Sequence, residues 1–286
     1  MIDLILFVLV LSALIIASIF DIKTKEIPNW LAYTFISLAL TANLIYSVLE
    51  NNYQIILKSF LGFAFFFIIG NVMYYTQQWG GGDAKLVMGL GAALYTYPKF
   101  LLDYFSPNLI LPFTLTLFIN ILIIGSIYSI IWALYLMYKN FNQFTKGLKI
   151  KLKKTKNIQK IILLIILLLI IISIMLNIEK IIMTTFSILI IILLYLLIAI
   201  KTIDEICMYK IVPLSKLTEG DWIPKPIYYK QKVLIKCKAE GLTKKDILLL
   251  KKYKIKEILI REGIPFVPSL LISFILTIIF GFLFTF

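Results

Sequence analysis

The chain has 286 residues, of which 61% are hydrophobic and only 15% are charged. The mean hydropathy is +0.96, and because no soluble fold of this length buries so much apolar surface, the composition predicts a membrane protein. Histidine is absent, which excludes Ser-His-Asp and Cys-His catalysis and the metal and haem sites that use an imidazole ligand. Cys207 and Cys237 are too few for a metal site of cysteines alone and are not spaced as a redox pair.

Seven apolar runs are long enough to cross the roughly 30 Å hydrocarbon core of a bilayer. They lie at about Ile2–Phe20, Trp30–Leu49, Ile55–Gln77, Leu109–Met137, Ile161–Asn177, Ile181–Ile200 and Pro265–Phe286. An eighth run, Ala84–Tyr97, is shorter and contains two glycines, so we expect a helix that is sheltered by its neighbours and little exposed to lipid. The sequence therefore predicts an all-α polytopic membrane protein with about eight transmembrane helices and a small α+β cytoplasmic lobe.

The basic residues are unevenly distributed over the connections between these runs. With the eighth helix included, 26 of the 29 lysines and arginines fall on one side of the membrane, and only Lys58, Lys99 and Lys180 fall on the other. Because basic loops stay in the cytoplasm, this split predicts a multi-pass protein of the cell membrane with both termini outside. The first run begins with Asp3 and lacks a basic n-region, so we expect a permanent helix and not a cleaved signal peptide.

One extended stretch, residues 201–264, has the composition of a water-soluble segment. Its sequence predicts a turn, two short strands and a helix that a capping box opens and that runs to about Tyr253. These elements are expected at Glu219–Asp221, Lys232–Lys236, Lys256–Ile260 and from Thr243–Asp246 onward. Together they predict the small cytoplasmic lobe.

The net charge of +14 would suggest a nucleic-acid partner in a soluble protein, but in a polytopic membrane protein such an excess usually sets topology. The most basic stretch, Lys146–Lys160, is expected to lie on the membrane surface. Each lysine there would contribute about 1 kcal/mol of attraction to anionic lipids. We therefore expect a lipid bilayer with anionic lipids, and no nucleic acid, as the partner of this stretch.

Two carboxylates lie at the ends of apolar runs and beside unusual local sequences. Asp21 directly follows the first run, and Asp83 follows three consecutive glycines ahead of the short run. The topology places both at the cytoplasmic face, on neighbouring connections. Three glycines in a row favour close approach of another backbone, such as an extended peptide. A simpler interpretation stays open, in which Asp83 only caps its helix and Asp21 is a solvated loop residue.

Both segments resemble the motifs of a known family. Gly80-Gly81-Gly82-Asp83 is a G-x-G-D motif, and Asp21-x-Lys23-x-x-x-Ile27-Pro28-Asn29 resembles the D-x-[RK]-x-x-x-I-P-N signature of type IV prepilin peptidases. These are GxGD-type aspartyl proteases of the membrane. Gly263–Pro268, which opens the last run, resembles the archaeal branch that includes the prearchaellin peptidases. The resemblance implies removal of the short basic leader (the class III signal peptide) of pilin-like or archaellin precursors at the cytoplasmic face.

The chain also departs from the bacterial members of that family. It lacks the cytoplasmic insertion with paired Cys-x-x-Cys motifs that is associated with N-methylation, so we expect a peptidase without methyltransferase activity. The hairpin 161–200 adds two helices to the six expected for a prearchaellin peptidase. We accordingly divide the chain into a catalytic transmembrane core (1–138), a basic loop with the extra hairpin (139–200), the cytoplasmic lobe (201–264) and a C-terminal transmembrane helix (265–286).

The resemblance implies that Asp21 and Asp83 are the catalytic pair. Residues beside them are candidates for substrate binding or for support of the pair, namely Gly80, Gly81, Gly82, Lys23, Glu26 and Lys85. Two carboxyl groups held close together share a proton and titrate jointly, so one draws a proton from the attacking water while the other donates to the peptide carbonyl. This chemistry needs no metal ion and no cofactor. Lys23 and Lys85 either orient the carboxylates or extend toward the membrane surface.

Three other functions are compatible with parts of the sequence. A polytopic transporter or ion pathway would use Asp21 and Asp83 as cation sites, although both lie at a membrane edge and no second pair of broken helices is present. A scaffold of a pilus assembly platform would leave the glycine run unexplained. A presenilin-like protease pairs its G-x-G-D motif with a Tyr-Asp on the preceding helix, whereas Ile55–Gln77 contains no Asp.

Overall fold

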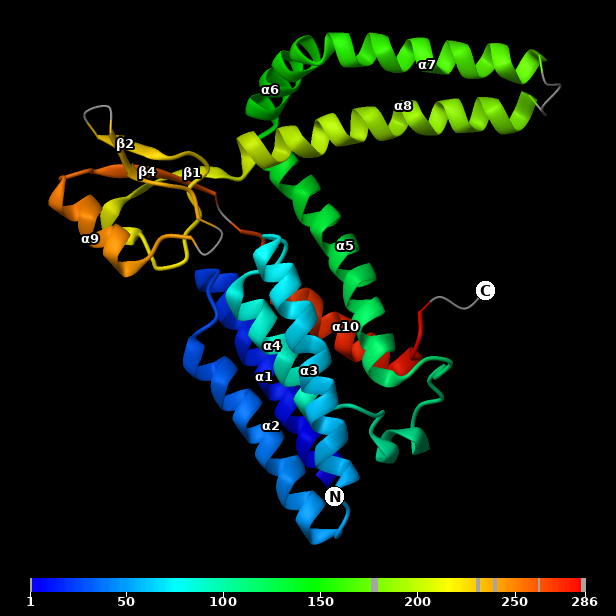
Figure 1. The fold of residues 1–286 in the computed structure, drawn as a ribbon, viewed down its shortest axis with the longest axis vertical. Coiled ribbons are helices and arrows are strands. Elements are labelled where there is room, and N and C mark those ends of the chain that lie inside the picture. Colours follow the sequence, from blue (N-terminus) through cyan, green and yellow to red (C-terminus); the bar gives the residue numbers. More distant parts are fainter. Residues whose placement is uncertain (1, 176–179, 230–231, 239–240, 262, 284–286) are drawn as a thin grey trace. The chain divides into compact units, whose positions relative to one another are not determined.

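The computed structural model describes residues 2–175, 180–229, 232–238, 241–261 and 263–283. The chain forms two compact units, each of which is made of segments that are separate in the sequence (Figure 1). The first unit consists of Met1–Ile130, Leu214–Lys256 and Gly263–Phe286, and the second of Ile131–Pro213 and Glu257–Glu262. The long helix α5 (Phe113–Lys139) runs from the first unit into the second.

The helices of the first unit surround one short central helix. Besides the first part of α5, the unit contains α1 (Ile2–Thr24), α2 (Asn29–Leu49), α3 (Gln54–Tyr75), α4 (Gly81–Ala93), a short 3-10 helix (Lys99–Asp103) and α10 (Val267–Phe280). The helix α4 packs along α3 and against α2, while α1 packs against α10 and α2 (Figure 1). The first and last helices of the chain are therefore neighbours in space.

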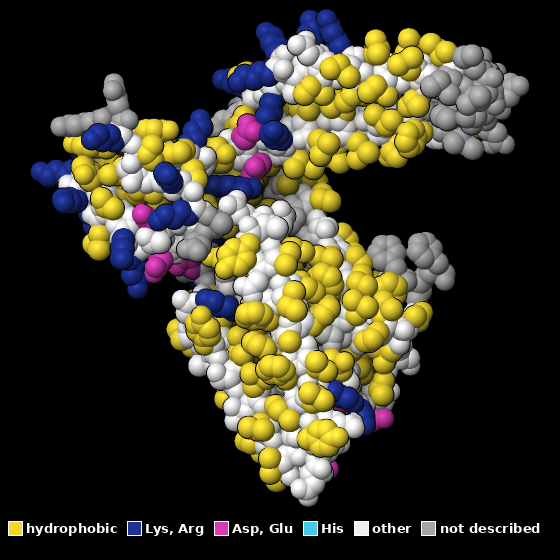
Figure 2. Space-filling view, viewed as in Figure 1, with side chains coloured by type: hydrophobic (Ala, Val, Ile, Leu, Met, Phe, Trp, Pro, Cys, Tyr) yellow, Lys and Arg dark blue, Asp and Glu magenta, His cyan; other side chains and the backbone are white. Residues whose placement is uncertain are grey.

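The core of this unit follows from the helical spacing of its buried side chains. On α1, buried residues recur every three or four positions, as in Leu6, Val10 and Leu14, which places them on one face of the helix. The buried side chains of Leu270 and Phe274 on α10 belong to the same core. Large apolar side chains on the other faces are exposed (Figure 2), as expected for helices that contact lipid.

Among the described residues, five helices are long and apolar enough to cross a membrane. They are Ile2–Thr24, Asn29–Leu49, Gln54–Tyr75, Phe113–Lys139 and Thr184–Cys207. The chain is therefore a mostly helical, multi-pass membrane protein with a small strand region, but the expected count of about eight spans is not confirmed. The last expected span, Pro265–Phe286, contains the 14-residue helix α10. This helix ends at Phe280, and the next residue, Gly281, has a φ of +70°. Residues 284–286 lie outside the described part.

The helix α4 is short because the backbone carbonyl groups at its end find hydrogen-bond donors inside the bundle. It has 13 residues, which corresponds to about 20 Å at 1.5 Å per residue, and ten of them are buried. The last carbonyl groups of a helix need partners, and a membrane interior offers no water. Here Asn43 Nδ2 of α2 and Ser59 Oγ of α3 donate to the carbonyl oxygen of Ala92 at 3.0 and 2.6 Å. The expectation of a sheltered helix is thus confirmed, although the helix ends at Ala93 and not at Tyr97.

The second unit combines a helical hairpin with a strand pair. Its elements are α6 (Phe141–Lys154), α7 (Lys156–Met175), α8 (Lys180–Thr202), a π-helical turn (Ile203–Cys207), β1 (Tyr209–Pro213) and β4 (Glu257–Arg261). The helices α7 and α8 lie side by side (Figure 1), as expected for the extra hairpin, whose residue Asn177 lies outside the described part. The strands β1 and β4 pair antiparallel, and Arg261 forms an ion pair of 2.6 Å with Asp204 of the π-helical turn.

The remaining lobe residues belong to the first unit. They form a 3-10 turn (Leu214–Lys216), the antiparallel strands β2 (Ile227–Tyr229) and β3 (Lys232–Ile235), and α9 (Lys244–Lys252). The predicted turn, capping box and helix are confirmed, because Gly220 has a φ of +103° and Thr243 Oγ1 accepts the N–H of Asp246 at 3.3 Å. The predicted strands correspond to β3 and to β4, while β1 and β2 were not expected.

Candidate active site

Asp21 lies in the last turn of α1 and is buried. Its carboxylate Oδ2 accepts the backbone N–H of Val267 at 2.8 Å. Val267 is the first residue of α10, so the donor belongs to the end of a helix where backbone N–H groups lack intrahelical partners and where negative charge is stabilised. With 5% of its surface exposed, Asp21 is not the solvated loop residue of the simpler interpretation.

Asp83 is the third residue of α4, and it caps that helix. Its Oδ2 accepts the backbone N–H of Gly80, the N-cap residue, at 2.9 Å. The capping interpretation of Asp83 therefore describes a real contact. Because an ionised carboxylate offers about four acceptor positions, this contact leaves room for a second role. Asp83 precedes the apolar part of α4. Burial is the main cause that raises the pKa of its carboxyl group, and the negative charge of Asp21 raises it further.

Phe266 and Val267 contact the two segments that carry the motifs. The ring of Phe266 packs on the ring of Trp79, which precedes the glycine run, with 5.7 Å between centroids. The next residue, Val267, donates its N–H to Asp21. The start of α10 thus contacts both the Asp21 motif and the segment leading to Asp83, two features that lie far from it in the sequence.

Two further contacts join the motifs directly. A Cβ atom on Gly82 would lie 2.7 Å from Cβ of Ile27, so only glycine permits this approach of the two segments. Lys85 Nζ donates to Asn29 Oδ1 at 2.7 Å and lies 4.8 Å from the ring centroid of Tyr33, within the range of a cation–π interaction. Lys85 therefore links the helix of one motif to the last residue of the other.

The other candidate residues are less constrained. A Cβ on Gly80 would lie 3.1 Å from Oδ2 of Asp83, whereas on Gly81 it would only reach ordinary contact, 3.4 Å from the ring of Tyr74. Packing thus explains why glycine is needed at position 82 and, in part, at position 80. Of the three positions, Gly81 would accept a Cβ atom most easily. Lys23 and Glu26 are exposed, and within the described part of the chain neither side chain has a recorded hydrogen bond or ion pair.

Sequence reasoning missed three groups that surround Asp21. The Val267 amide is separated from Asp21 by 246 positions, and only the Gly263–Pro268 resemblance drew attention to that segment. The phenol of Tyr128 on α5 lies within electrostatic range of Asp21. Ser18, one turn before Asp21, has a buried hydroxyl without a hydrogen-bond partner among the described residues. No local sequence signal marks either of the last two.

The arrangement suits acid–base chemistry by carboxyl groups. Among the described residues, no group of three or more His, Cys, Asp or Glu side chains has the arrangement of a metal site. Two neighbouring buried carboxyl groups can share one proton, and such a pair can both activate a water molecule and protonate a leaving or carbonyl oxygen. Fold and site together define a polytopic helical membrane protein with a buried pair of aspartates on neighbouring helices.

The comparisons with known proteins agree with the two motifs. Residues 8–137 match the model of the type IV leader peptidase family. This range contains Asp21, the glycine run and Asp83, so the resemblance to type IV prepilin peptidases is confirmed for the N-terminal segment. No solved structure gives a significant match.

Named relatives come from archaea. The chain is 37% identical over 147 residues to a preflagellin peptidase of Methanococcus voltae, which covers 49% of this chain and 60% of the relative. It is 34% identical over 94 residues to a preflagellin peptidase of Methanocaldococcus jannaschii, covering 33% and 38%, and 29% identical over 133 residues to prepilin peptidase EppA of Methanothermobacter thermautotrophicus, covering 45% and 34%. The matched segments thus span from about a third to three fifths of these relatives.

Proposed function

We propose that this protein is a membrane-embedded aspartic endopeptidase. It removes the basic leader of prepilin-like or prearchaellin subunits at the cytoplasmic face of the cell membrane. The names of the relatives, preflagellin peptidase and prepilin peptidase, support this substrate class.

The observation that carries the proposal is that the two motif aspartates are both buried and that the same segment, the start of α10, contacts Asp21 and the residues before Asp83. Both are buried, at 5% exposure for Asp21 and 9% for Asp83, and the start of α10 contacts Asp21 and the Trp79 segment before Asp83. Two carboxylates that are merely structural would not need to be buried within electrostatic range of each other, because like charges destabilise a dry site. A hydrolytic pair requires that proximity.

In the proposed mechanism the pair holds one proton between its two carboxyl groups. The ionised member accepts a proton from a water molecule while that water attacks the scissile carbonyl carbon. The protonated member donates its proton to the carbonyl oxygen, which gives a tetrahedral gem-diol. The carboxyl group that took the proton from water then gives it to the leaving nitrogen as the C–N bond breaks, and the other carboxylate takes a proton from the gem-diol. This releases the leader with a new carboxyl terminus and the subunit with a new amine, and it restores the shared proton. The glycine run precedes Asp83 and carries no side chains, so an extended leader would lie along its backbone.

The topology belongs to the same proposal. Both termini lie outside, the 201–264 lobe and the basic loop lie in the cytoplasm, and the transmembrane core of residues 1–138 carries the catalytic pair. The exposed lysines of α6, which are Lys146, Lys149, Lys153 and Lys154, face anionic lipid headgroups. Glu26 beside Asp21 attracts the basic leader.

The test is cleavage of a leader-bearing precursor by detergent-solubilised protein. Asp21→Asn and Asp83→Asn should each lower the rate by roughly 100- to 10,000-fold, because an amide cannot exchange the proton. Asn still accepts a hydrogen bond, so the contacts to Val267 and Gly80 survive and the variants should fold. The double variant should lose little more than either single one, since both residues act on one transition state.

Two controls separate catalysis from structure. Asp246→Asn changes a carboxylate that caps α9 as Asp83 caps α4, and Asp103→Asn changes an exposed carboxylate on the 3-10 helix; both should cleave at nearly the normal rate. If Asp21→Asn retains about a tenth of the activity, Asp21 is not in the pair, and Glu26 becomes the next candidate. Absence of cleavage by the unmodified protein, together with stabilisation by a cation, would favour the transporter.

A further inference from the structure

We propose that the backbone N–H of Val267 is a third component of the site, which positions Asp21 and stabilises its ionised form. This inference rests on the proposed peptidase function and deepens it. It gives the start of α10, outside both motifs, a defined part in the reaction.

The contact has the geometry of a strong hydrogen bond. Its length is 2.8 Å, and both partners are buried, at 5% exposure for Asp21 and 0% for Val267. Hydrogen bonds to a charged acceptor are about twice as strong as neutral ones, and burial removes the competition with water. Val267 is also the first residue of a 14-residue helix, whose N-terminus adds a favourable partial positive charge.

The backbone amide of Val267 is held in place by the contacts of the preceding residue, Phe266, with three other residues. The ring of Phe266 packs on Trp79, and a Cβ on Gly125 of α5 would lie 2.8 Å from Cε2 of Phe266. The carbonyl oxygen of Phe266 accepts both the N–H and the hydroxyl of Ser269, at 2.9 and 2.7 Å. The Val267 N–H is thus fixed before any substrate arrives, and its position is coupled through Trp79 to the segment that carries Asp83.

The other charged and titratable groups near Asp21 explain why such a donor is needed. Asp83 on α4 disfavours a second negative charge, while Lys25, the residue after α1, favours it. The phenol of Tyr128 on α5 lies within electrostatic range of Asp21 as well, and the backbone amide of Phe266 also interacts with the carboxyl group. α10 carries no titratable side chain, and the further titratable groups on the packed helices are Asp3 and Lys23 of α1, Tyr33 and Tyr46 of α2, Lys85 of α4, and Tyr135, Tyr138 and Lys139 of α5. The backbone amides at the start of α10 are therefore fixed neutral donors to Asp21.

The test replaces the backbone N–H of Val267 by an oxygen atom and keeps the side chain. Val267→Pro is unsuitable, because Phe266 is in the right-handed helical region with ψ −25°, which a following proline disfavours. We would instead replace Val267 by its α-hydroxy acid in the full chain, which turns the amide into an ester. Cleavage of a leader-bearing precursor is then measured as kcat and KM across the pH range.

The ester should lower kcat by roughly 10- to 100-fold with little change in KM. The acid limb of the pH profile should move to higher pH by about one unit, because the ionised carboxylate loses a donor. The ester also weakens the carbonyl of Phe266, so Ser269→Ala is the matched control: it removes a donor to that carbonyl and keeps the Val267 N–H. Its acid limb should stay at the wild-type position. An ester enzyme with the wild-type kcat and pH profile would overturn the inference while the peptidase function stands.

A second measurement works without cleavage. The amide nitrogen shift of Val267 in wild-type protein should follow a titration that Asp21→Asn abolishes. A Val267 signal that does not titrate, or that titrates unchanged in Asp21→Asn, would refute the contact even if the ester protein fails to fold. If wild-type protein cleaves no precursor, the proposed function is wrong, and this titration still decides whether the amide and the carboxylate are bonded.

Discussion

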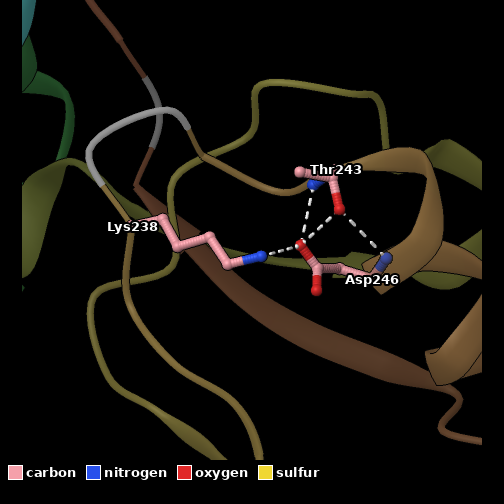
Figure 3. Close-up of polar contacts among 3 residues, drawn as sticks. All are labelled: Lys238, Thr243 and Asp246. Atoms are coloured by element: carbon pink, nitrogen blue, oxygen red, sulfur yellow. Dashed lines mark hydrogen bonds and ion pairs between the residues drawn. The ribbon is translucent and has the colours of Figure 1, made fainter.

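Asp83 and Asp246 occupy the same position in two different helices. Each is the third residue of its helix, and each accepts the backbone N–H of the N-cap residue at 2.9 Å. Their surroundings differ, because Asp246 also accepts hydrogen bonds from the ammonium group of Lys238 at 2.8 Å and from the hydroxyl of Thr243 (Figure 3), whereas Asp83 lies within electrostatic range of the carboxyl group of Asp21. The same capping contact thus holds Asp246 in an ion pair with a lysine, and it holds Asp83 near a second carboxyl group.

The partners of Asp246 predict how the stability of the lobe depends on pH. Burial raises the pKa of Asp246, but the hydrogen bonds from Lys238 and Thr243 outweigh it and lower the pKa below its usual value. A lowered pKa stabilises the folded state above the unfolded pKa, near 3.9, and that stability is lost as the pH falls through the folded pKa. The protection of α9 amides against hydrogen exchange, relative to the intrinsic exchange rate at each pH, should therefore fall below about pH 4.

Lys238→Met is the matched variant for this effect. It removes the ammonium donor and should reduce the acid dependence of α9 exchange while leaving leader cleavage unchanged. Equal acid dependence in both proteins would show that Lys238 does not set the protonation of Asp246.

Two adjacent glycines should respond differently to alanine. Gly82→Ala places a Cβ 2.7 Å from Cβ and 2.8 Å from Cδ1 of Ile27, so the two motif segments must separate and activity should fall by more than about tenfold. Gly81→Ala meets only ordinary contacts with Tyr74 and should fold normally. Cleavage assays and thermal unfolding check both variants.

Ile27→Ala in the Gly82→Ala background removes the Cγ1 and Cδ1 contacts and should restore part of the lost activity. No rescue, together with normal unfolding of Gly82→Ala, would mean that Gly82 contacts substrate and not Ile27.

The internal cap of α4 should contribute to stability. Ser59→Ala removes the 2.6 Å hydrogen bond to the carbonyl oxygen of Ala92, and Asn43→Leu removes the donor at 3.0 Å. A buried carbonyl that loses a partner costs about 1–3 kcal/mol, so thermal unfolding in detergent should shift down for each variant. Both together should cost more than either alone, because Ala92 then loses both donors. Unfolding temperatures equal to wild type would indicate that α4 ends elsewhere.

Ser18→Ala should be neutral or stabilising. The Ser18 hydroxyl is buried and has no hydrogen-bond partner among the described residues. Replacing an unpaired buried polar group by an apolar one removes its desolvation cost, about 1 kcal/mol or more. Ser273→Ala is the contrast, since Ser273 Oγ donates to the carbonyl oxygen of Ser269 at 2.6 Å; it should destabilise. Thermal unfolding of the two variants shows whether each substitution raises or lowers the stability. A strongly destabilised Ser18→Ala would reveal a partner for that hydroxyl.

The sequence by itself determined what depends on neighbours along the chain. The apolar runs that become α1, α2 and α3, and the capping box from Thr243 to Asp246, follow from local periodicity and local hydrogen bonds, and the structure contains them close to their expected bounds. The order and spacing of the two motifs were enough to indicate the family, because a motif is a local pattern.

Only the tertiary structure decided what depends on contacts between distant segments. Periodicity shows that a face is buried but not what covers it, so no local pattern predicted that Val267 would donate to Asp21 or that Lys85 would reach Asn29. The length of α4 was misjudged for the same reason, because its end is set by side chains of Asn43 and Ser59 on two other helices. Hydropathy measures how apolar a segment is, whereas the helix end depends on which partner satisfies the last carbonyl groups.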